Sequence, residues 1–182
     1  GCFDNINHRL LLKKLWRIGI HDKRVLKIIS QMLKAGYIDQ DLYHATEMGT
    51  PQGGILSPLL SNVYLNDFDW YVGRCYMEPH RQCKHKCNDT RRLKWAGTTP
   101  KYNFRYADDW VVLTSTEKEA FRMKCELTKY FRQKLKLELS QEKTYVTDLR
   151  KGGIHFLGYI VKAERKRKTP DPATWTEHLV GK

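Results

Sequence analysis

The sequence predicts an α+β fold, in which an antiparallel sheet carries helices packed mainly on one face. Three observations predict it. Four segments have apolar residues at helical spacing, residues 102–114 contain two short runs rich in aromatic and β-branched residues, and an acidic pair separates those two runs. Because an antiparallel sheet often leaves its second face uncovered, we expect that face to be open to a ligand.

Two amphipathic helices are expected near the N-terminus. The first covers residues 9–18, where leucines recur at the spacing of one helix face. The second covers residues 22–35, with Asp22 as its N-cap and Gly36 at its C-terminal end. Residues 37–47 are expected to be extended and to form a weak hairpin.

A loop rich in glycine and proline leads into the third expected helix, at residues 58–72. Three glycines and two prolines within residues 49–58 exclude the interior of a helix or of a central strand. Ser57 is a capping residue and Pro58 suits the first helical position. A glycine-rich loop before a helix N-terminus is an arrangement that binds phosphate, although a simple structural turn explains it about as well.

Residues 73–100 are polar, basic and irregular in pattern, and we interpret them as an insertion between two core elements. The insertion contains candidate zinc ligands at Cys75, His80, Cys83, His85 and Cys87. Of these, only Cys83 and Cys87 have the close spacing of paired ligands in structural zinc sites. The pattern therefore favours a solvated basic loop over a zinc site.

The hairpin expected at 102–114 is the most informative element. Aromatic and β-branched residues on both sides of Asp108 and Asp109 predict two strands joined by a tight turn. Two adjacent carboxylates repel each other, and a divalent cation such as Mg²⁺ relieves that repulsion by binding carboxylate oxygens. Paired metal ions of this kind support phosphoryl transfer. An ordinary acidic turn is the alternative, but the apolar flanking runs in so basic a chain argue against it.

The C-terminal third predicts one more helix, at residues 117–134, which begins at a capping box of Thr116 and Glu119. The residues expected on its buried face are Ala120, Phe121, Leu127 and Phe131. The three leucines that alternate as in a strand are Leu135, Leu137 and Leu139. Residues 154–161 predict a final strand or hairpin. Residues 162–182 are interpreted as a basic tail that links to a thumb domain outside this chain.

Charge and composition restrict the class of protein. Lys and Arg number 33 against 20 Asp and Glu, which gives a net charge of +13. Nucleic acid is the commonest partner of such a chain, and a basic surface that serves only solubility is the alternative. No apolar run approaches the roughly 18 residues that span a bilayer, and no secretory signal is present. Five cysteines without framework spacing indicate a reducing compartment. We therefore expect a soluble protein with no membrane partner.

Five motifs follow one another in a characteristic order: Phe3-Asp4-Asn5-Ile6-Asn7-His8, Gly49-Thr50-Pro51-Gln52-Gly53-Gly54-Ile55-Leu56-Ser57-Pro58-Leu59-Leu60-Ser61-Asn62, Tyr106-Ala107-Asp108-Asp109, Glu142-Lys143-Thr144 and Phe156-Leu157-Gly158-Tyr159. Together they resemble the reverse transcriptases encoded by group II introns, which are also called maturases. The resemblance covers nearly the whole chain up to about Val161. It implies a reverse transcriptase palm over residues 1–161, with the insertion at 73–100, and RNA-directed DNA polymerase activity by two-metal-ion nucleotidyl transfer.

The resemblance also implies site residues and ligands. Asp108 and Asp109 would bind Mg²⁺, or Mn²⁺ in its place, and Lys143 would approach the triphosphate and protonate the leaving pyrophosphate. The residues expected beside the incoming nucleotide, template and primer end are Phe3, Pro51, Gln52, Gly53 and Ala107. The residues expected to form the primer grip are Phe156, Leu157 and Gly158. The expected partners are an RNA template, group II intron RNA, a DNA primer and dNTPs, in a bacterial cytoplasm. The oligomeric state stays open, with a dimer as one option.

The sequence departs from the family pattern at its beginning. In the family, motif A reads Asp-Ile-Lys-Gly-Cys-Phe-Asp, so its first, metal-binding Asp would lie three residues upstream of Gly1. Asp4 is better explained as a helix cap than as a replacement ligand. We therefore expect this fragment alone to be a poor catalyst. The alternative function is an RNA-binding splicing cofactor with a dispensable polymerase, but an acidic pair facing an anionic ligand favours the enzyme.

Overall fold

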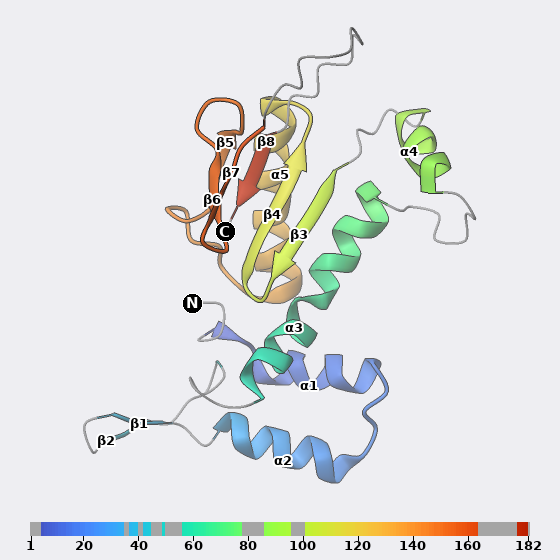
Figure 1. The fold of residues 1–182 in the computed structure, drawn as a ribbon. Coiled ribbons are helices and arrows are strands. Elements are labelled where there is room, and N and C mark those ends of the chain that lie inside the picture. The colour runs from blue at the N-terminus through green and yellow to red at the C-terminus, as the bar shows by residue number, and fades with distance from the viewer. Residues whose placement is uncertain are drawn as a thin grey trace, which may run out of the picture. The chain divides into compact units, whose positions relative to one another are not determined.

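The fold comes from a computed structural model, which describes residues 5–34, 37–39, 42–44, 49, 56–77, 86–95, 101–163 and 178–181 (Figure 1). The chain divides into two compact units. The first unit consists of Gly1–Asp67 and Phe131–Glu138, and the second consists of Phe68–Tyr130 and Leu139–Lys182. Helices and small antiparallel sheets together confirm the predicted α+β class.

The first unit is mainly helical. It contains α1 (His8–Arg17), α2 (Lys23–Lys34) and the first part of α3 (Ser57–Val72), with a short antiparallel pair of strands, β1 (Tyr37–Asp39) and β2 (Leu42–His44). Helix α1 begins where it does because the side chain of Asn7 accepts a hydrogen bond from the N–H of Leu10 at 2.9 Å. The prediction that Asp4 caps this helix was therefore wrong, because Asn7 is the residue three positions before Leu10 and supplies the acceptor. These elements confirm the helices and the extended segment predicted for this part of the sequence.

A buried lysine joins α1 to α3 within the first unit. The Nζ of Lys14 donates hydrogen bonds to the carbonyl of Tyr64 at 2.8 Å and to the carboxylate of Asp67 at 2.7 Å. Burial lowers the pKa of Lys14, and the hydrogen bond to Asp67 opposes that shift. Tyr64 is itself fully buried, and its hydroxyl donates to the carbonyl of Leu135 at 2.5 Å. This network fixes the first part of α3.

The second unit is built on a four-stranded antiparallel sheet. Its strand order is β3 (Tyr102–Tyr106), β4 (Asp109–Thr114), β8 (His178–Gly181) and β5 (Tyr145–Asp148). A separate hairpin consists of β6 (Ile154–Phe156) and β7 (Tyr159–Val161). Helix α5 (Glu117–Tyr130) continues as a π-helical turn at Phe131–Leu135. The predicted capping box is present in part, because Glu119 N–H donates to Thr116 Oγ1 at 3.3 Å.

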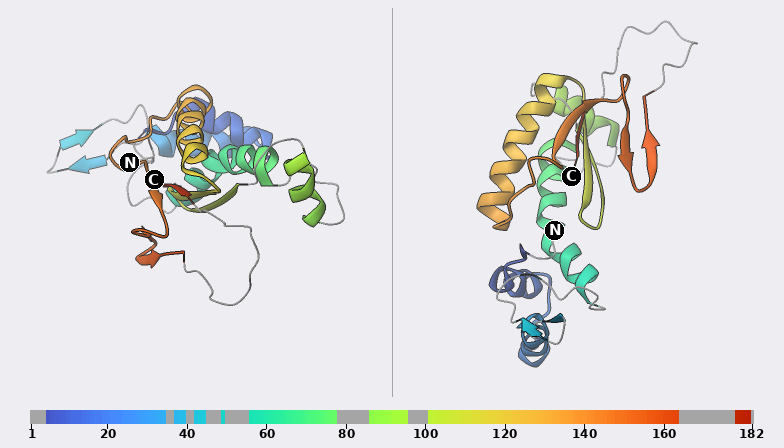
Figure 2. Two further views of the ribbon diagram at one scale, coloured as in Figure 1. Left: turned by 90° about the horizontal axis from the view of Figure 1, so that it is seen from above. Right: turned by 90° about the vertical axis from the view of Figure 1, so that its left-hand side faces the viewer.

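The two faces of this sheet are covered differently. Helix α5 buries Ala120, Met123 and Leu127 on one face. On the same side, the ring of Phe68 in α3 meets that of Trp110 with centroids 5.4 Å apart. The β6–β7 hairpin lies on the other side, as Figure 2 shows. The prediction that helices cover one face thus holds for α5 and the end of α3, whereas α1 and α2 belong to the other unit.

Strand β8 differs from the expectation for residues 162–182, which we interpreted as a linker. Residues His178–Gly181 pair with β4 on one side and with β5 on the other. A four-residue strand is too short for sequence periodicity to identify it. Its conformation depends on the two neighbouring strands, which satisfy the backbone hydrogen bonds on both sides. Strand β5 is equally short and was missed for the same reason.

Other differences concern the insertion and the leucine run. Within residues 73–100, a π-helical turn at Gly73–Met77 and α4 (Lys86–Trp95) replace the expected irregular structure, and the apolar side chain of Leu93 in α4 is buried. The segment after α5 is not a strand, because Lys136 has φ 55° and the N–H of Leu137 donates back to the carbonyl of Phe131 at 3.1 Å. This left-handed residue ends the helix. Phe121 was expected to be buried, but its side chain is 52% exposed.

Candidate active site

The acidic pair lies at the tip of the β3–β4 hairpin. Tyr106 pairs with Asp109, so the turn consists of Ala107 and Asp108 alone. Ala107 has φ 53°, in the left-handed region where residues other than glycine are strained. A positive φ at the first of two turn residues is typical of the turns that match the twist of a hairpin. The predicted tight turn between two strands is therefore confirmed, with Asp108 in the turn and Asp109 as the first residue of β4.

Arg105 holds this turn against α3. Its guanidinium donates to both carboxylate oxygens of Asp69, from Nε at 2.9 and 3.0 Å and from a terminal nitrogen at 2.6 Å. The other terminal nitrogen donates to the carbonyl of Ala107 at 2.6 Å. Asn103, two residues earlier in β3, donates to the same carboxylate at 3.2 Å. We call Arg105 and Asp69 the hairpin clamp.

The clamp was missed by the sequence analysis. Arg105 and Asp69 are 36 positions apart, and no local motif connects them. One signal was available: Asn103 and Arg105 occupy alternate positions of β3, so both point to the same side of the strand. Two polar residues on the side of a strand that packs on a helix require a polar partner on that helix.

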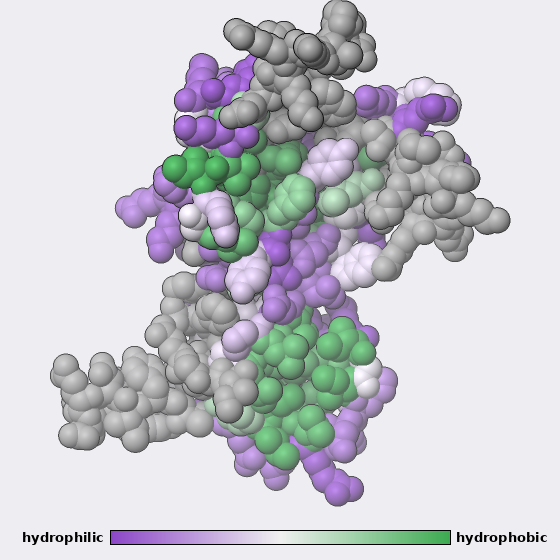
Figure 3. All heavy atoms as spheres, viewed as in Figure 1, coloured by the Kyte–Doolittle hydropathy of each residue, from purple (hydrophilic) through white to green (hydrophobic). Residues whose placement is uncertain are grey.

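The face of the sheet that carries Asp109 also presents a row of aromatic side chains. Strand alternation and the pairing of Tyr106 with Asp109 and of Phe104 with Val111 place Tyr102, Phe104 and Tyr106 on that face. Their side chains are 40%, 52% and 67% exposed, in that order. Figure 3 shows the surface of the same sheet, coloured by hydropathy. Exposed aromatic rings of this kind can stack on bases and sugars.

Lys143 lies at the same end of the sheet as the acidic pair. Val111 pairs with Gly181, and Gly181 pairs with Tyr145, so Val111 and Tyr145 occupy one row. Strands β4 and β5 run in the same direction on either side of β8. Asp109 comes two residues before that row in β4, and Lys143 comes two residues before it in the turn that precedes β5, so both lie toward the same end of the sheet. The side chain of Lys143 is exposed in the turn before β5.

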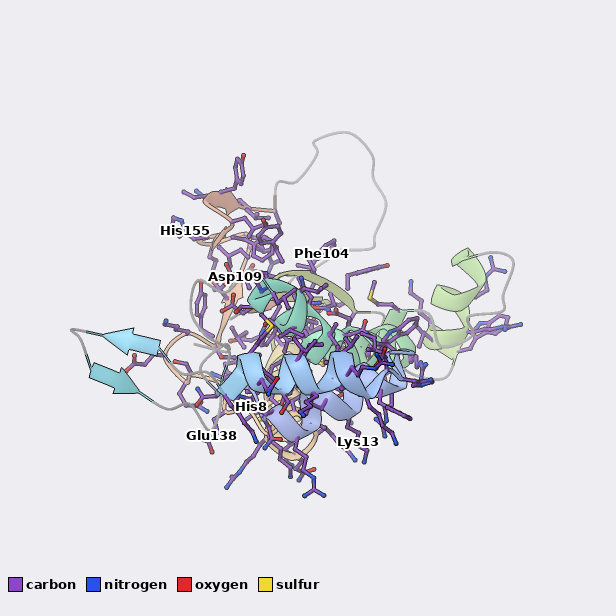
Figure 4. All side chains as sticks on the ribbon, turned by 90° about the horizontal axis from the view of Figure 1, so that it is seen from below. His8, Lys13, Phe104, Asp109, Glu138 and His155 are labelled. Atoms are coloured by element: carbon purple, nitrogen blue, oxygen red, sulfur yellow. The ribbon has the colours of Figure 1, made fainter. Side chains whose placement is uncertain are left out.

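The predicted primer-grip residues form the turn of the β6–β7 hairpin. Leu157 has φ 53° and Gly158 has φ 81°, the two positive values of a type I′ turn. Phe156 packs against a core cluster that includes Val111, which shares the sheet face of Asp109. Figure 4 labels Asp109, Phe104 and His155 of β6, which come from the strands that build this region. The acidic pair, Lys143 and this hairpin thus belong to one unit.

Several predicted site residues lie outside the described residues. These are Phe3, Pro51, Gln52 and Gly53 of the nucleotide site, and His80, Cys83 and His85 of the candidate zinc ligands. Cys87 lies in α4, where only its backbone is described. Cys75 is exposed by its overall surface area. Its thiol is nevertheless partly desolvated, and this desolvation together with the nearby Glu126 carboxylate raises the pKa of the thiol. The zinc site therefore stays a prediction.

Among the residues that the structure describes, no group of three or more His, Cys, Asp or Glu side chains could hold a metal ion. A metal ion at the acidic pair would therefore depend on further oxygen ligands, such as water and substrate phosphates, which Mg²⁺ usually retains.

Among the described residues, no helix has the length and apolar character to cross a membrane.

Comparison with known proteins agrees with this geometry. A model of the family "Reverse transcriptase (RNA-dependent DNA polymerase)" matches residues 1–161. The group II intron-encoded protein LtrA of Lactococcus lactis subsp. cremoris is 34% identical over 206 residues, which cover 91% of this chain and 34% of that protein. Protein YkfC of Escherichia coli is 34% identical over 177 residues, which cover 91% of this chain and 45% of that protein.

A third relative is the putative COX1/OXI3 intron 1 protein of Saccharomyces cerevisiae. It is 30% identical over 211 residues, which cover 100% of this chain and 25% of that protein. The chain thus spans less than half the length of each of the three relatives. Since the family model covers most of the sequence, the chain belongs to the reverse transcriptase family of RNA-dependent DNA polymerases.

Proposed function

We propose that the protein containing this chain is an RNA-directed DNA polymerase of the group II intron type, and that residues 1–161 form its palm, with residues 73–100 inserted. One observation carries the proposal: Asp109, the first residue of β4, and Lys143, in the turn before β5, lie toward the same end of the four-stranded sheet, and the sheet face of Asp109 also carries three exposed aromatic side chains. A polymerase requires acidic groups that bind metal ions and a basic group in the same region, because the metal ions and the cation both contact one triphosphate. The names of two of the relatives support the intron type.

The acidic pair suits a divalent metal ion. The reverse transcriptase family depends on divalent metals, and Asp108 and Asp109 offer adjacent, half-buried carboxylates, which are hard ligands suited to Mg²⁺ or Mn²⁺. The guanidinium of Arg105 is engaged by Asp69 and by the carbonyl of Ala107. When bound, the metal would supply charge neutralisation at the transferred phosphoryl group.

The other residues have positioning and proton-transfer roles in this proposal. Lys143 donates a proton or a hydrogen bond toward the pyrophosphate that leaves the incoming dNTP. The turn Leu157–Gly158, held by Phe156 against the core cluster, positions the 3′ end of the DNA primer. The exposed rings of Tyr102, Phe104 and Tyr106 line the face on which the duplex of RNA template and DNA primer lies. Ala107 approaches the primer end, and Phe3, Pro51, Gln52 and Gly53 contact the nucleotide.

A splicing cofactor is the second candidate function. The net charge of +13 and the relatives named after introns favour an RNA-binding role. Both functions can belong to one protein, since RNA binding and DNA synthesis use different groups. The acidic pair distinguishes them, because a protein that only binds RNA gains nothing from two carboxylates directed at a polyanion.

The test is RNA-templated primer extension with Mg²⁺ by the full-length protein that contains this chain. The variant combines Asp108→Asn with Asp109→Asn, which keeps size and removes the negative charge. We expect extension to fall at least about 10³-fold, since several kcal/mol of transition-state stabilisation are lost, while RNA affinity is retained. The matched control is Asp22→Asn, an exposed helix cap. Absence of extension by the unaltered protein, with RNA binding intact, would instead support the splicing cofactor.

A further inference from the structure

The outer face of α5 carries cations in one row. Lys118, Arg122 and Lys129 are all exposed. At about 100° per residue, the three lie within about 40° of one another around the helix axis. The buried residues of α5, Ala120, Met123 and Leu127, lie on the opposite side of the helix. The row therefore faces solvent directly, and its ends are about 16 Å apart along the helix.

The acidic residues between these cations point elsewhere. The carboxylate of Glu126 accepts hydrogen bonds from the hydroxyls of Tyr71 and Tyr76, the latter at 2.7 Å to each oxygen. Burial and the hydrogen bond to Glu126 raise the pKa of both phenols, so that they stay protonated donors. Glu119 is half-buried, with Oε2 inaccessible to solvent. Helix α5 contains both acidic and basic residues, but only basic side chains carry charge in the exposed row between residues 118 and 129.

Phe121 presents an apolar ring beside this row, about 60–100° around the helix axis from the three cations. Its side chain is 52% exposed, one residue before Arg122 and three after Lys118. Among the residues that the structure describes, none of the three cations forms an ion pair. Free cations beside an exposed aromatic ring are the combination that binds nucleic acid, through phosphate contacts and through stacking on a base or sugar. A row that served only solubility would not need the ring.

The row cannot serve the duplex at the acidic pair. Helix α5 and the β6–β7 hairpin lie on opposite sides of the sheet (Figure 2), and Asp109 lies on the side of the hairpin. We propose that Lys118, Phe121, Arg122 and Lys129, here called the α5 ridge, bind the backbone of a structured RNA that is separate from the template and primer. This inference rests on the proposed function, since it assumes a protein that acts on RNA.

The experiment uses the full-length protein with Lys118→Gln, Arg122→Gln and Lys129→Gln combined. The probe is a blunt 20-base-pair RNA hairpin, which offers no recessed primer end. We expect its affinity to fall at least about tenfold, and the slope of log affinity against log salt to become shallower by about 3. Primer extension on a short unstructured template should change less than about twofold, because the ridge lies on the other side of the sheet. A second variant, Phe121→Ala, should weaken hairpin binding about fivefold through lost stacking.

The matched control removes the same charge elsewhere, by Lys23→Gln, Arg24→Gln and Lys27→Gln in α2. If it weakens hairpin binding as much as the ridge variant does, the effect is one of net charge and the proposal is overturned. Unchanged hairpin affinity in the ridge variant overturns it as well, and so does an equal loss of affinity for a 20-base-pair DNA duplex. Failure of the proposed polymerase is distinguishable, because then the unaltered protein extends no primer.

Discussion

The two hairpins on the sheet unit have the same turn length but are stabilised in different ways. In both, the first turn residue has φ 53°: Ala107 in β3–β4 and Leu157 in β6–β7. The β6–β7 turn has glycine at its second position, and its strand residue Phe156 packs on an apolar cluster. The β3–β4 turn has Asp108 at that position, and charged groups of the hairpin clamp hold it.

This difference follows from what each turn presents. A turn that exposes carboxylates cannot be covered by apolar side chains, because burial without a partner would penalise the charged form. The clamp fixes the backbone through the carbonyl of Ala107, and the side chains of Asp108 and Asp109 stay half-buried, with Oδ1 of Asp109 inaccessible to solvent. Backbone strain that persists at a rigid, polar turn is typical of functional sites. The turn of β6–β7 needs only a fixed shape, which glycine and apolar packing supply.

The largest effect is expected from Arg105→Met, which breaks the clamp. The change leaves Asp69 without its main partner in a half-buried position, 34% exposed. We expect a loss of about 2–3 kcal/mol in the free energy of unfolding. Primer extension should fall roughly 10- to 100-fold, because the acidic pair loses its fixed position. Urea unfolding and steady-state kinetics measure the two effects.

The control for this change is Arg150→Met. Arg150 also donates to an aspartate, Asp148, at 2.9 and 3.1 Å, with the Arg150 side chain 48% and the Asp148 side chain 13% exposed. Asp148 also accepts a hydrogen bond from the backbone N–H of Arg150 at 2.9 Å, which the substitution leaves in place. Because the guanidinium is largely exposed and Asp148 keeps its backbone donor, stability should fall much less than in Arg105→Met and extension should not change measurably. Equal effects of the two substitutions would contradict the special role of the clamp.

The next effect is expected at Gly153, beside the β6–β7 hairpin. Its φ is 71°, and an added Cβ would lie 2.7 Å from the carbonyl oxygen of Val161 and 2.5 Å from Cγ of Lys162. Gly153→Ala should therefore destabilise the protein by about 2 kcal/mol. An alanine is strained at this φ, and its Cβ would clash with the backbone oxygen of Val161, which cannot move aside as a flexible side chain can. Thermal unfolding checks this.

Gly152→Ala provides the neighbouring comparison. No atom lies within 4 Å of a Cβ at Gly152, and its φ is outside the left-handed region. We expect no loss of stability there, and a small gain is compatible with the lower entropy of the unfolded chain. A larger loss of stability from Gly152→Ala than from Gly153→Ala would contradict the left-handed conformation and the close contacts of Gly153.

The smallest effect is expected from glycine at the two strained turn positions. Ala107→Gly removes a strain of about 1–2 kcal/mol and adds about 0.5–1 kcal/mol of backbone entropy cost, so the net gain should be about 0.5–1 kcal/mol. Leu157→Gly should gain less, because it also loses side-chain contacts. Differential scanning calorimetry can compare the two variants. A loss of stability at Ala107 would mean that the clamp has already removed the strain.

Local pattern was sufficient where the chemistry is local. The acidic turn, the helix start at Thr116 and the hairpin at 154–161 depend on residues within a few positions of one another, and each was identified from sequence. Strands β5 and β8 were not, because a four-residue segment becomes a strand only when its neighbours satisfy its backbone hydrogen bonds. Phe121 was assigned to the core because helical spacing alone does not say how wide the buried face is.

The sequence by itself determined the class of fold, the acidic pair and the family, since these depend on local periodicity and on motifs in order. Only the tertiary structure decided which groups act together. It brought the turn of Lys143 and the first residue of β4, Asp109, toward one end of the sheet, and it paired Arg105 with Asp69 across 36 positions. It also bonded the Glu126 carboxylate to the hydroxyl of Tyr76, while the cations Lys118, Arg122 and Lys129 of α5 are exposed to solvent. The physical reason is that pairing and charge segregation depend on distances in space, which sequence spacing fixes only within a single helix or strand.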